Sequence, residues 1–191
     1  MCRYGMIAYK PHLACFKCRK TIKRKLLKDI NRDALYDEKY EDSIAKCPQC
    51  TGLLADMGLD FKSPKKTDVK SWKHLEDLYA VGLTFHSCGC FGPGYMPKDS
   101  QAIVDHLSAI KANYVKQRSF WARLKSEPKS QSEFSKDQNK NWIYYAEIPK
   151  ELNIGTKNKP KYDTVGAQNY WTARITEVET KILQIKIVNK M

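Results

Sequence analysis

The chain has 191 residues, enough for one domain or for a small domain with added parts, and 42% of them are hydrophobic, which excludes a wholly disordered chain. Charged residues interrupt every apolar stretch before it reaches the roughly 18 residues of a membrane-spanning helix, and the N-terminus lacks the apolar region of a secretory signal. We therefore expect a cytoplasmic protein without a membrane partner. The 34 Lys and Arg exceed the 21 Asp and Glu, and the net charge of +13 favours polyanionic partners such as nucleic acid.

Four of the seven cysteines form two Cys-x-x-Cys pairs, Cys15 with Cys18 and Cys47 with Cys50. An odd number of cysteines without a secretory signal argues against a disulfide framework. A two-residue gap lets both sulfurs of a tight turn face one ion, and two such turns supply four thiolates. Thiolate is a soft ligand, so the predicted ion is Zn²⁺ rather than Mg²⁺ or Ca²⁺. The alternative is that one pair is a redox dithiol, although neither pair lies in a thioredoxin-like strand–helix setting.

The residues around these pairs resemble a zinc ribbon over about residues 4–60. Cys-Pro-x-Cys followed by Thr51-Gly52 is similar to the second knuckle of such a ribbon, and Cys-Phe-Lys-Cys is similar to a less regular first one. A wider pattern between Met57 and Pro97 resembles small uncharacterised bacterial zinc-ribbon proteins. The resemblance implies a metal site but no activity. Because zinc ribbons occur in transcription factors, ribosomal proteins and polymerase subunits as well as in structural inserts, it also raises the expectation of nucleic-acid binding.

The order of patterns along the chain predicts an α+β protein in four parts. Residues 1–66 would form the zinc ribbon, with four cysteine ligands. Residues 67–126 would form a helical region that includes a Gly-, Pro- and Cys-containing loop at 83–99. Residues 127–141 contain one aromatic and no aliphatic residue, so they are the predicted linker, and residues 142–191 are predicted to be a β-rich C-terminal extension.

The first predicted helix covers residues 68–81. Thr67 is a suitable N-cap, apolar residues then recur at helical spacing, and Gly82 offers a C-terminal stop. Trp72 lies on this helix, and we expect it in the core rather than on a base-stacking surface.

The second predicted helix covers residues 101–126, with Ser100 as its cap. Its apolar residues recur at spacings of four and three, and Gln117 fills the one polar position of this stripe. Such a stripe fits packing within a monomer, or a protein partner or homodimer that binds through helix 101–126.

Three segments of the C-terminal extension have the composition or the alternation of strands. Residues 142–148 are rich in aromatic and β-branched residues, while residues 170–178 and 181–188 alternate between apolar and polar positions. Glu179-Thr180 could join the last two segments as a hairpin. The sequence therefore predicts a small antiparallel β unit at the C-terminus.

The Gly-rich loop contains the one further group of reactive side chains, His86, Cys88 and Cys90. With Cys2 or His12 these residues could bind a second metal ion, or the two cysteines could be a redox pair or ordinary free thiols. The sequence contains no metalloprotease, phosphate-loop, dinucleotide or nucleophile-elbow motif, so an enzyme is the less favoured class.

Two groups of basic residues are the candidates for contact with nucleic-acid phosphates. The first follows the first cysteine pair, and an acidic segment at 29–42 could neutralise it and leave only a solvated face. The sequence therefore predicts a zinc-stabilised module that binds the RNA or DNA backbone, with a protein-interaction adaptor and a thiol-redox or metal enzyme at the His86 loop as alternatives. The candidate residues are Arg19, Lys20, Lys23, Arg24 and Lys25, with Lys62, Lys65 and Lys66 as a second patch.

Overall fold

A computed structural model of the chain describes residues 10, 12–23, 45–87, 91–124, 131–156 and 161–190. The chain divides into two compact units, Met1–Ile103 and Val104–Met191, which we call the N-terminal unit and the C-terminal unit. A small antiparallel sheet and several helices make up the described residues, which agrees broadly with the predicted α+β class. None of the described helices has the length and hydrophobicity needed to cross a membrane.

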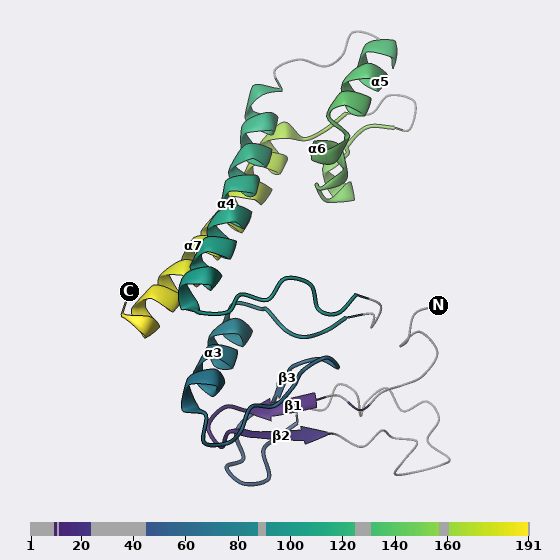
Figure 1. The fold of residues 1–191 in the computed structure, drawn as a ribbon. Helices are drawn as coiled ribbons and strands as arrows, with labels where there is room; N and C mark the ends of the chain where they lie inside the picture. Colours follow the sequence, from purple (N-terminus) through teal and green to yellow (C-terminus); the bar gives the residue numbers. More distant parts are fainter. Residues whose placement is uncertain are drawn as a thin grey trace, which may run out of the picture. The chain divides into compact units, whose positions relative to one another are not determined.

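The N-terminal unit contains a three-stranded antiparallel sheet (Figure 1). Its strands β1 (His12–Cys15), β2 (Lys20–Lys23) and β3 (Ala55–Asp56) have the order β2-β1-β3. Because β1 is the central strand, three of its four residues are buried. The pairing of Cys15 with Lys20 closes a tight turn between β1 and β2, and this turn contains the first cysteine pair.

The segment after β3 packs against the first arm of the Gly-rich loop. Phe85 donates its backbone N–H to the carbonyl oxygen of Met57 at 2.8 Å, and the rings of Phe61 and Phe85 lie 5.6 Å apart. Gly58 has a φ of +83°, and a Cβ there would lie 2.3 Å from the backbone nitrogen of His86. Only glycine fits this position, which gives the Met-Gly pair of the wider sequence pattern a structural reason.

Helix α3 (Val69–Ala80) corresponds to the predicted helix 68–81. Its N-cap is Asp68 rather than Thr67, because the Asp68 carboxylate accepts a hydrogen bond from the backbone N–H of Ser71 at 3.0 Å. Gly82 follows the helix in the left-handed conformation, with a φ of +85°. Trp72 is 2% exposed and its indole N–H donates to the carbonyl of Lys65, so the expectation that it lies in the core is confirmed.

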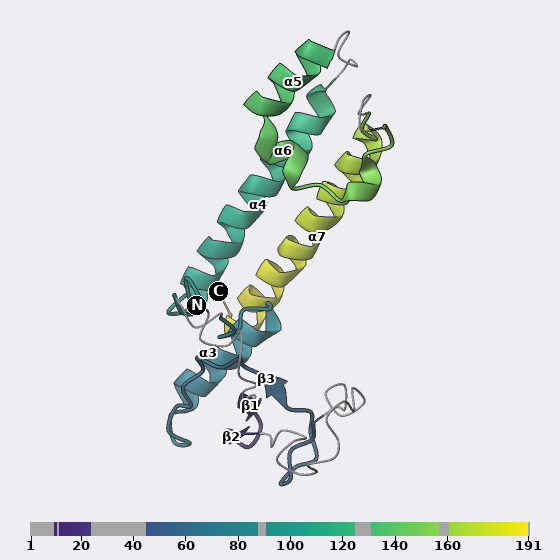
Figure 2. The ribbon, with the colours of Figure 1, turned by 90° about the vertical axis from the view of Figure 1, so that its right-hand side faces the viewer.

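Two long helices dominate the C-terminal unit, α4 (Ser100–Arg123) and α7 (Thr164–Asn189). Figure 2 shows them side by side, and in Figure 1 α7 passes behind α4. The Nζ of Lys111 on α4 lies 2.9 Å from a carboxylate oxygen of Glu179 on α7. Further along α4, the ring of Tyr114 lies 5.2 Å from that of Trp171, which comes earlier in α7. The two helices are therefore antiparallel.

Helix α4 differs in detail from the predicted helix 101–126. It begins at Ser100, and its first turn is capped by Asp99, whose carboxylate accepts a hydrogen bond from the backbone N–H of Ala102 at 2.8 Å. The predicted cap at Ser100 is therefore wrong, and the cap lies one residue earlier.

The apolar stripe of α4 is covered by other parts of the same chain. Trp121 is fully buried, and its ring lies 5.5 Å from that of Tyr145 and 5.6 Å from that of Tyr162. Gln117, the polar member of the stripe, is 1% exposed and donates a hydrogen bond to the carboxylate of Glu147. This packing accounts for the stripe without a second copy of the chain.

The predicted linker at 127–141 is wrong for its described residues, because α5 (Gln131–Lys140) lies within it. Two side chains anchor this polar helix. Phe134 is 6% exposed, and its ring lies 6.1 Å from that of Tyr145 and 6.3 Å from that of Tyr162, while the carboxylate of Asp137 accepts a hydrogen bond from the hydroxyl of Tyr145. One buried aromatic residue and one hydrogen-bonded carboxylate therefore hold a segment whose composition resembles that of a disordered one.

The predicted C-terminal β unit at 142–191 is also wrong. Residues 142–146 form the short helix α6 (Trp142–Ala146), which the turn η1 (Lys150–Leu152) follows, and both segments expected to pair as a hairpin belong to the single helix α7. Asp163 caps α7 by accepting a hydrogen bond from the backbone N–H of Gly166 at 2.8 Å. The buried residues of α7 follow helical spacing, namely Ala167, Trp171, Ile175, Val178 and Ile185.

Candidate metal centre

The first cysteine pair lies in the turn between β1 and β2. Cys18 directs its backbone N–H at the sulfur of Cys15, 3.4 Å away, and Arg19 donates its backbone N–H to the carbonyl of Phe16 at 3.3 Å. Phe16 packs on α3, with its ring 5.7 Å from that of Tyr79. The turn is thus held by the sheet on one side and by a helix of the same unit on the other.

The second cysteine pair lies in a similar turn before β3. Cys47 donates its backbone N–H to the carbonyl of Gly52, and Thr51 donates its own to the carbonyl of Cys47, both at 2.8 Å. In each turn a non-glycine residue with positive φ follows the second cysteine directly, Arg19 at +51° and Thr51 at +58°. Such a φ is rare for a β-branched residue, so the two turns share a demanding backbone geometry.

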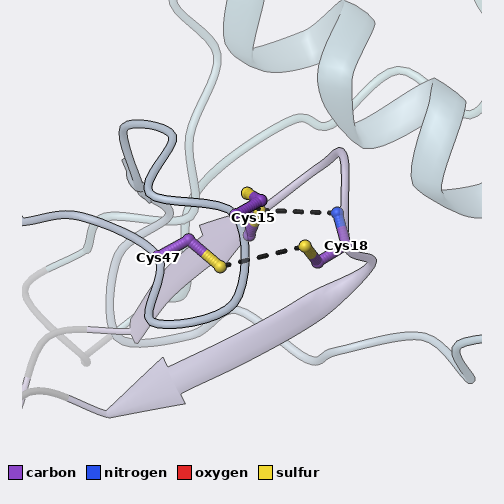
Figure 3. A group of neighbouring side chains, drawn as sticks. Cys15, Cys18 and Cys47 are labelled. Atoms are coloured by element: carbon purple, nitrogen blue, oxygen red, sulfur yellow. Dashed lines mark hydrogen bonds between the residues drawn. The ribbon is translucent and has the colours of Figure 1, made fainter.

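The four sulfurs form a compact cluster, and Figure 3 labels three of its members, Cys15, Cys18 and Cys47. The sulfur of Cys15 lies 3.6 Å from that of Cys50, the sulfur of Cys47 lies 3.9 Å from that of Cys18, and all four lie within 4.8 Å of one another. Four sulfurs at about 2.3 Å from a central zinc would be about 3.8 Å apart at the edges of the tetrahedron. The separations match this value and are much longer than the roughly 2.05 Å of a disulfide.

The surroundings of the sulfurs shift the cysteine pKa values in different directions. The backbone N–H groups of Cys50 and Gln49 lower the pKa of Cys47 to about 6. Contact with the Cys50 sulfur, together with desolvation, raises the pKa of Cys18 to about 12, and burial raises the pKa of Cys15. Four thiolates this close would repel one another, so all four would ionise together only around a bound cation.

The chain has no match that would name its function. No protein-family model, no curated protein and no solved structure matches it. The four-cysteine cluster therefore stands on its own geometry. Within the described part of the chain, it is the one group of three or more Cys, His, Asp or Glu side chains that could hold a metal ion. Two of its members, Cys15 and Cys47, are 2% and 1% exposed, which leaves little access for solvent ligands.

The other predicted reactive group is described only at His86. The imidazole nitrogens of this residue lie 2.8 Å from the hydroxyl of Thr84 and 3.4 Å from a carboxylate oxygen of Asp56. Cys88 and Cys90 lie outside the described residues, so the second metal or redox site stays a prediction. The same holds for Arg24, Lys25 and the acidic segment at 29–42.

Most of the predicted basic residues are described, and they lie in the N-terminal unit. The five lysines among them are exposed, and Arg19 is half-buried. A hydrogen bond of 2.8 Å from the hydroxyl of Thr21 to that of Ser63 brings their two groups together. Lys17, between the cysteines of the first turn, is a further exposed cation that the sequence reasoning missed, although its position within a Cys-x-x-Cys turn was a signal.

The C-terminal unit contains a hollow that the sequence reasoning also missed. It has a volume of about 610 Å³ and lies between α4 and α7, with Glu147, Trp171 and Arg174 in its lining. The guanidinium of Arg174 lies 5.5 Å from the centre of the Tyr170 ring. Because residues 170–178 were expected to form a strand, no sequence signal placed these side chains beside α4.

Proposed function

We propose that the chain is a zinc-stabilised nucleic-acid-binding module, and that it contacts the phosphate backbone through a basic face beside the four-cysteine centre. The observation that carries this proposal is the hydrogen bond between Thr21 and Ser63, 42 residues apart in the sequence. It joins the basic residues of β2 to the lysines that flank Ser63. Backbone contact of this kind is electrostatic and independent of sequence.

The alternation of β2 decides which of its cations shares a face with the second group. Side chains two residues apart in a strand point to the same side, so Lys23 lies on the side of Thr21. Lys62, Lys65 and Lys66 are within three residues of Ser63, at most about 11 Å along the chain. We call these four exposed lysines the basic face.

Arg19 adds a second argument, at the end of β2 nearest the cysteines. Its Nε–H is buried and has no hydrogen-bond acceptor among the described residues. A buried donor without an acceptor is costly, and a phosphate oxygen would satisfy it with a charge-assisted hydrogen bond. A zinc ion bound by the adjacent Cys18 would fix the backbone from which this guanidinium projects.

The test compares oligonucleotide binding by two variants. One has the charges of the basic face removed, and the other loses the same number of charges elsewhere on the protein. Binding to duplex and single-stranded oligonucleotides would be measured between 50 and 200 mM salt by fluorescence anisotropy, with the salt range chosen from the usual sensitivity of such complexes. The test variant carries Lys23→Gln, Lys62→Gln, Lys65→Gln and Lys66→Gln. The control carries four exposed lysines of the C-terminal unit changed to Gln, at Lys116, Lys136, Lys140 and Lys186.

We expect the test variant to bind every sequence more weakly and to have a flatter salt dependence, by up to about 0.7 to 0.9 in slope for each phosphate that the protein no longer neutralises. Both variants should retain the zinc content of the native protein, because no substituted residue is a ligand. If both variants weakened binding equally, the net charge of the protein and not the basic face would account for the binding. If neither variant changed binding or salt slope, the basic face would be a solvated surface.

One observation favours a protein-interaction adaptor as a second candidate. Leu183 and Ile187 lie one helical turn apart on α7 and are 58% and 67% exposed. Adjacent apolar side chains of this size on one helix face are typical of a docking surface for another protein. Absence of nucleic-acid binding in the native protein would make this candidate the leading one.

A further inference from the structure

We infer that the nucleic acid bound by this chain is single-stranded, and that Phe91 and Tyr95 stack on its bases. The inference rests on the proposed function and deepens it, because it names the class of nucleic acid and a second contact. Phe91 is 96% exposed and Tyr95 is 65% exposed. Exposed aromatic rings beside a basic surface are the usual means by which proteins hold single strands without reading their sequence.

The backbone around these two rings is open. Gly92 and Gly94 have φ angles of +74° and +81°, a conformation that glycine adopts without strain. Apart from the adjacent residues in the chain, no atom of the described residues lies within 4 Å of the place where a Cβ would stand on either glycine. The two glycines therefore add no side chain of their own beside the rings, which leaves more room for a planar base.

Both arms of the loop that carries the rings are attached to the N-terminal unit. On the first arm, Ser87 hydrogen-bonds through its hydroxyl to the carboxylate of Asp60. On the second arm, the carbonyl oxygen of Pro97 lies 2.9 Å from Nε2 of His74 on α3. The rings thus lie in a segment tethered at both ends to the unit that holds the basic face.

The first arm limits how far Phe91 can lie from the basic face. Phe91 is four residues after Ser87, and Lys62 is two residues after Asp60, so these chain segments cover at most about 14 Å and 7 Å. A strand with stacked bases rises about 3.4 Å per nucleotide, and about ten nucleotides are enough to reach both sites. One short strand can therefore place its bases on the rings and its phosphates on the lysines.

Stacking and phosphate contact respond differently to salt, and the experiment uses this difference. The probes are a labelled single strand of twelve thymidines, an abasic strand with the same phosphates, and a duplex of the same length. The proteins are the native chain, the variant Phe91→Ala/Tyr95→Ala, and the conservative variant Phe91→Trp. Trp142→Ala is the matched control, because Trp142 is 62% exposed but belongs to the other unit. Zinc content and circular dichroism confirm that each variant is folded.

We expect the double alanine variant to bind the thymidine strand roughly tenfold more weakly for each ring removed, with an unchanged salt slope. It should bind the abasic strand as the native protein does, and Phe91→Trp should retain the native affinity. If the native protein binds but the double variant binds the thymidine strand equally well, or if the native protein prefers the duplex, the inference is wrong and the proposed function stands. If the native protein binds none of the three probes, the proposed function fails as well.

Discussion

Removal of the metal is expected to unfold the N-terminal unit and to leave the C-terminal unit folded. The three strands among the described residues of the N-terminal unit have only 4, 4 and 2 residues, and two of the buried residues in its core are the cysteines Cys15 and Cys47. A structural zinc contributes about 10 to 16 kcal/mol of apparent folding free energy. A domain has a total stability of about 5 to 15 kcal/mol, so loss of the ion removes most or all of it.

Hydrogen exchange followed by mass spectrometry can measure this effect separately in the two units. In strong chelator, the amides of residues 12–23 and 45–61 should lose their protection. Those of α7 should keep it, because the aromatic packing around Trp121 includes no metal ligand among the described residues. The variant Cys47→Ser should behave like the chelated protein.

The control for the metal experiment is a chain in which other cysteines are replaced. A variant with Cys88→Ser and Cys90→Ser should retain one equivalent of zinc, since the four-cysteine cluster is already a closed set of ligands. Native protein without stoichiometric metal, or amides of β1 that stay protected in chelator, would refute a structural zinc at this site. Loss of protection in α7 as well would refute the independence of the two units.

Two further predictions concern the backbone of the N-terminal unit. Gly58→Ala should destabilise this unit by about 2 to 4 kcal/mol in urea denaturation, because the new Cβ would overlap the backbone of Phe85 and the φ of residue 58 is positive. A decrease in unfolding free energy of less than about 1 kcal/mol would show that the loop containing Phe85 moves away from the new Cβ at little cost. Thr51→Gly should stabilise the N-terminal unit by up to about 1 kcal/mol at constant zinc occupancy, because glycine adopts the φ of +58° without strain. A destabilised variant would mean that contacts of the threonine side chain stabilise the unit by more than the backbone strain at Thr51 destabilises it.

The first two helices could be predicted from the sequence because their signals are local. Apolar residues at helical spacing and Gly82 indicate α3, although Asp68 and not the expected Thr67 is its cap. For α4, the period of the stripe placed the helix correctly, while its cap was assigned one residue late because Asp99 and Ser100 are both good caps.

The sequence of the C-terminal helix predicts strands because some of its apolar residues fit both the period of a strand and the period of a helix. Residues four apart, such as Trp171 and Ile175, lie on one side of a strand and also on one side of a helix. The alternation then included Leu183 and Ile187, which the helix leaves exposed. The residue type at the expected hairpin was the available signal, since Glu179-Thr180 lacks the Gly, Asn or Asp that such a turn requires.

The cysteine cluster and the basic face differ in how much of each could be predicted. Each Cys-x-x-Cys pair is a local turn, so spacing alone indicated both halves of the metal centre. The two basic groups lie together because Thr21 contacts Ser63, and no local sequence pattern predicts this contact. Non-local contacts of this kind require the folded chain, and the same reason explains why the hollow between α4 and α7 was missed.

The N-terminal unit is synthesised before the C-terminal unit, so the two units become able to fold at different times. All four cysteines have been made once residue 50 is added, and the N-terminal unit is complete at Ile103. The 88 residues that follow take about 4 to 18 s at about 5 to 20 residues per second. During that interval Trp121 lacks Tyr162 and Trp171, so the nascent α4 presents an apolar stripe until α7 emerges. A ribosome stalled shortly after residue 124 would therefore hold the complete four-cysteine segment followed by a helix whose apolar stripe is uncovered, and uncovered apolar surface is what chaperones bind.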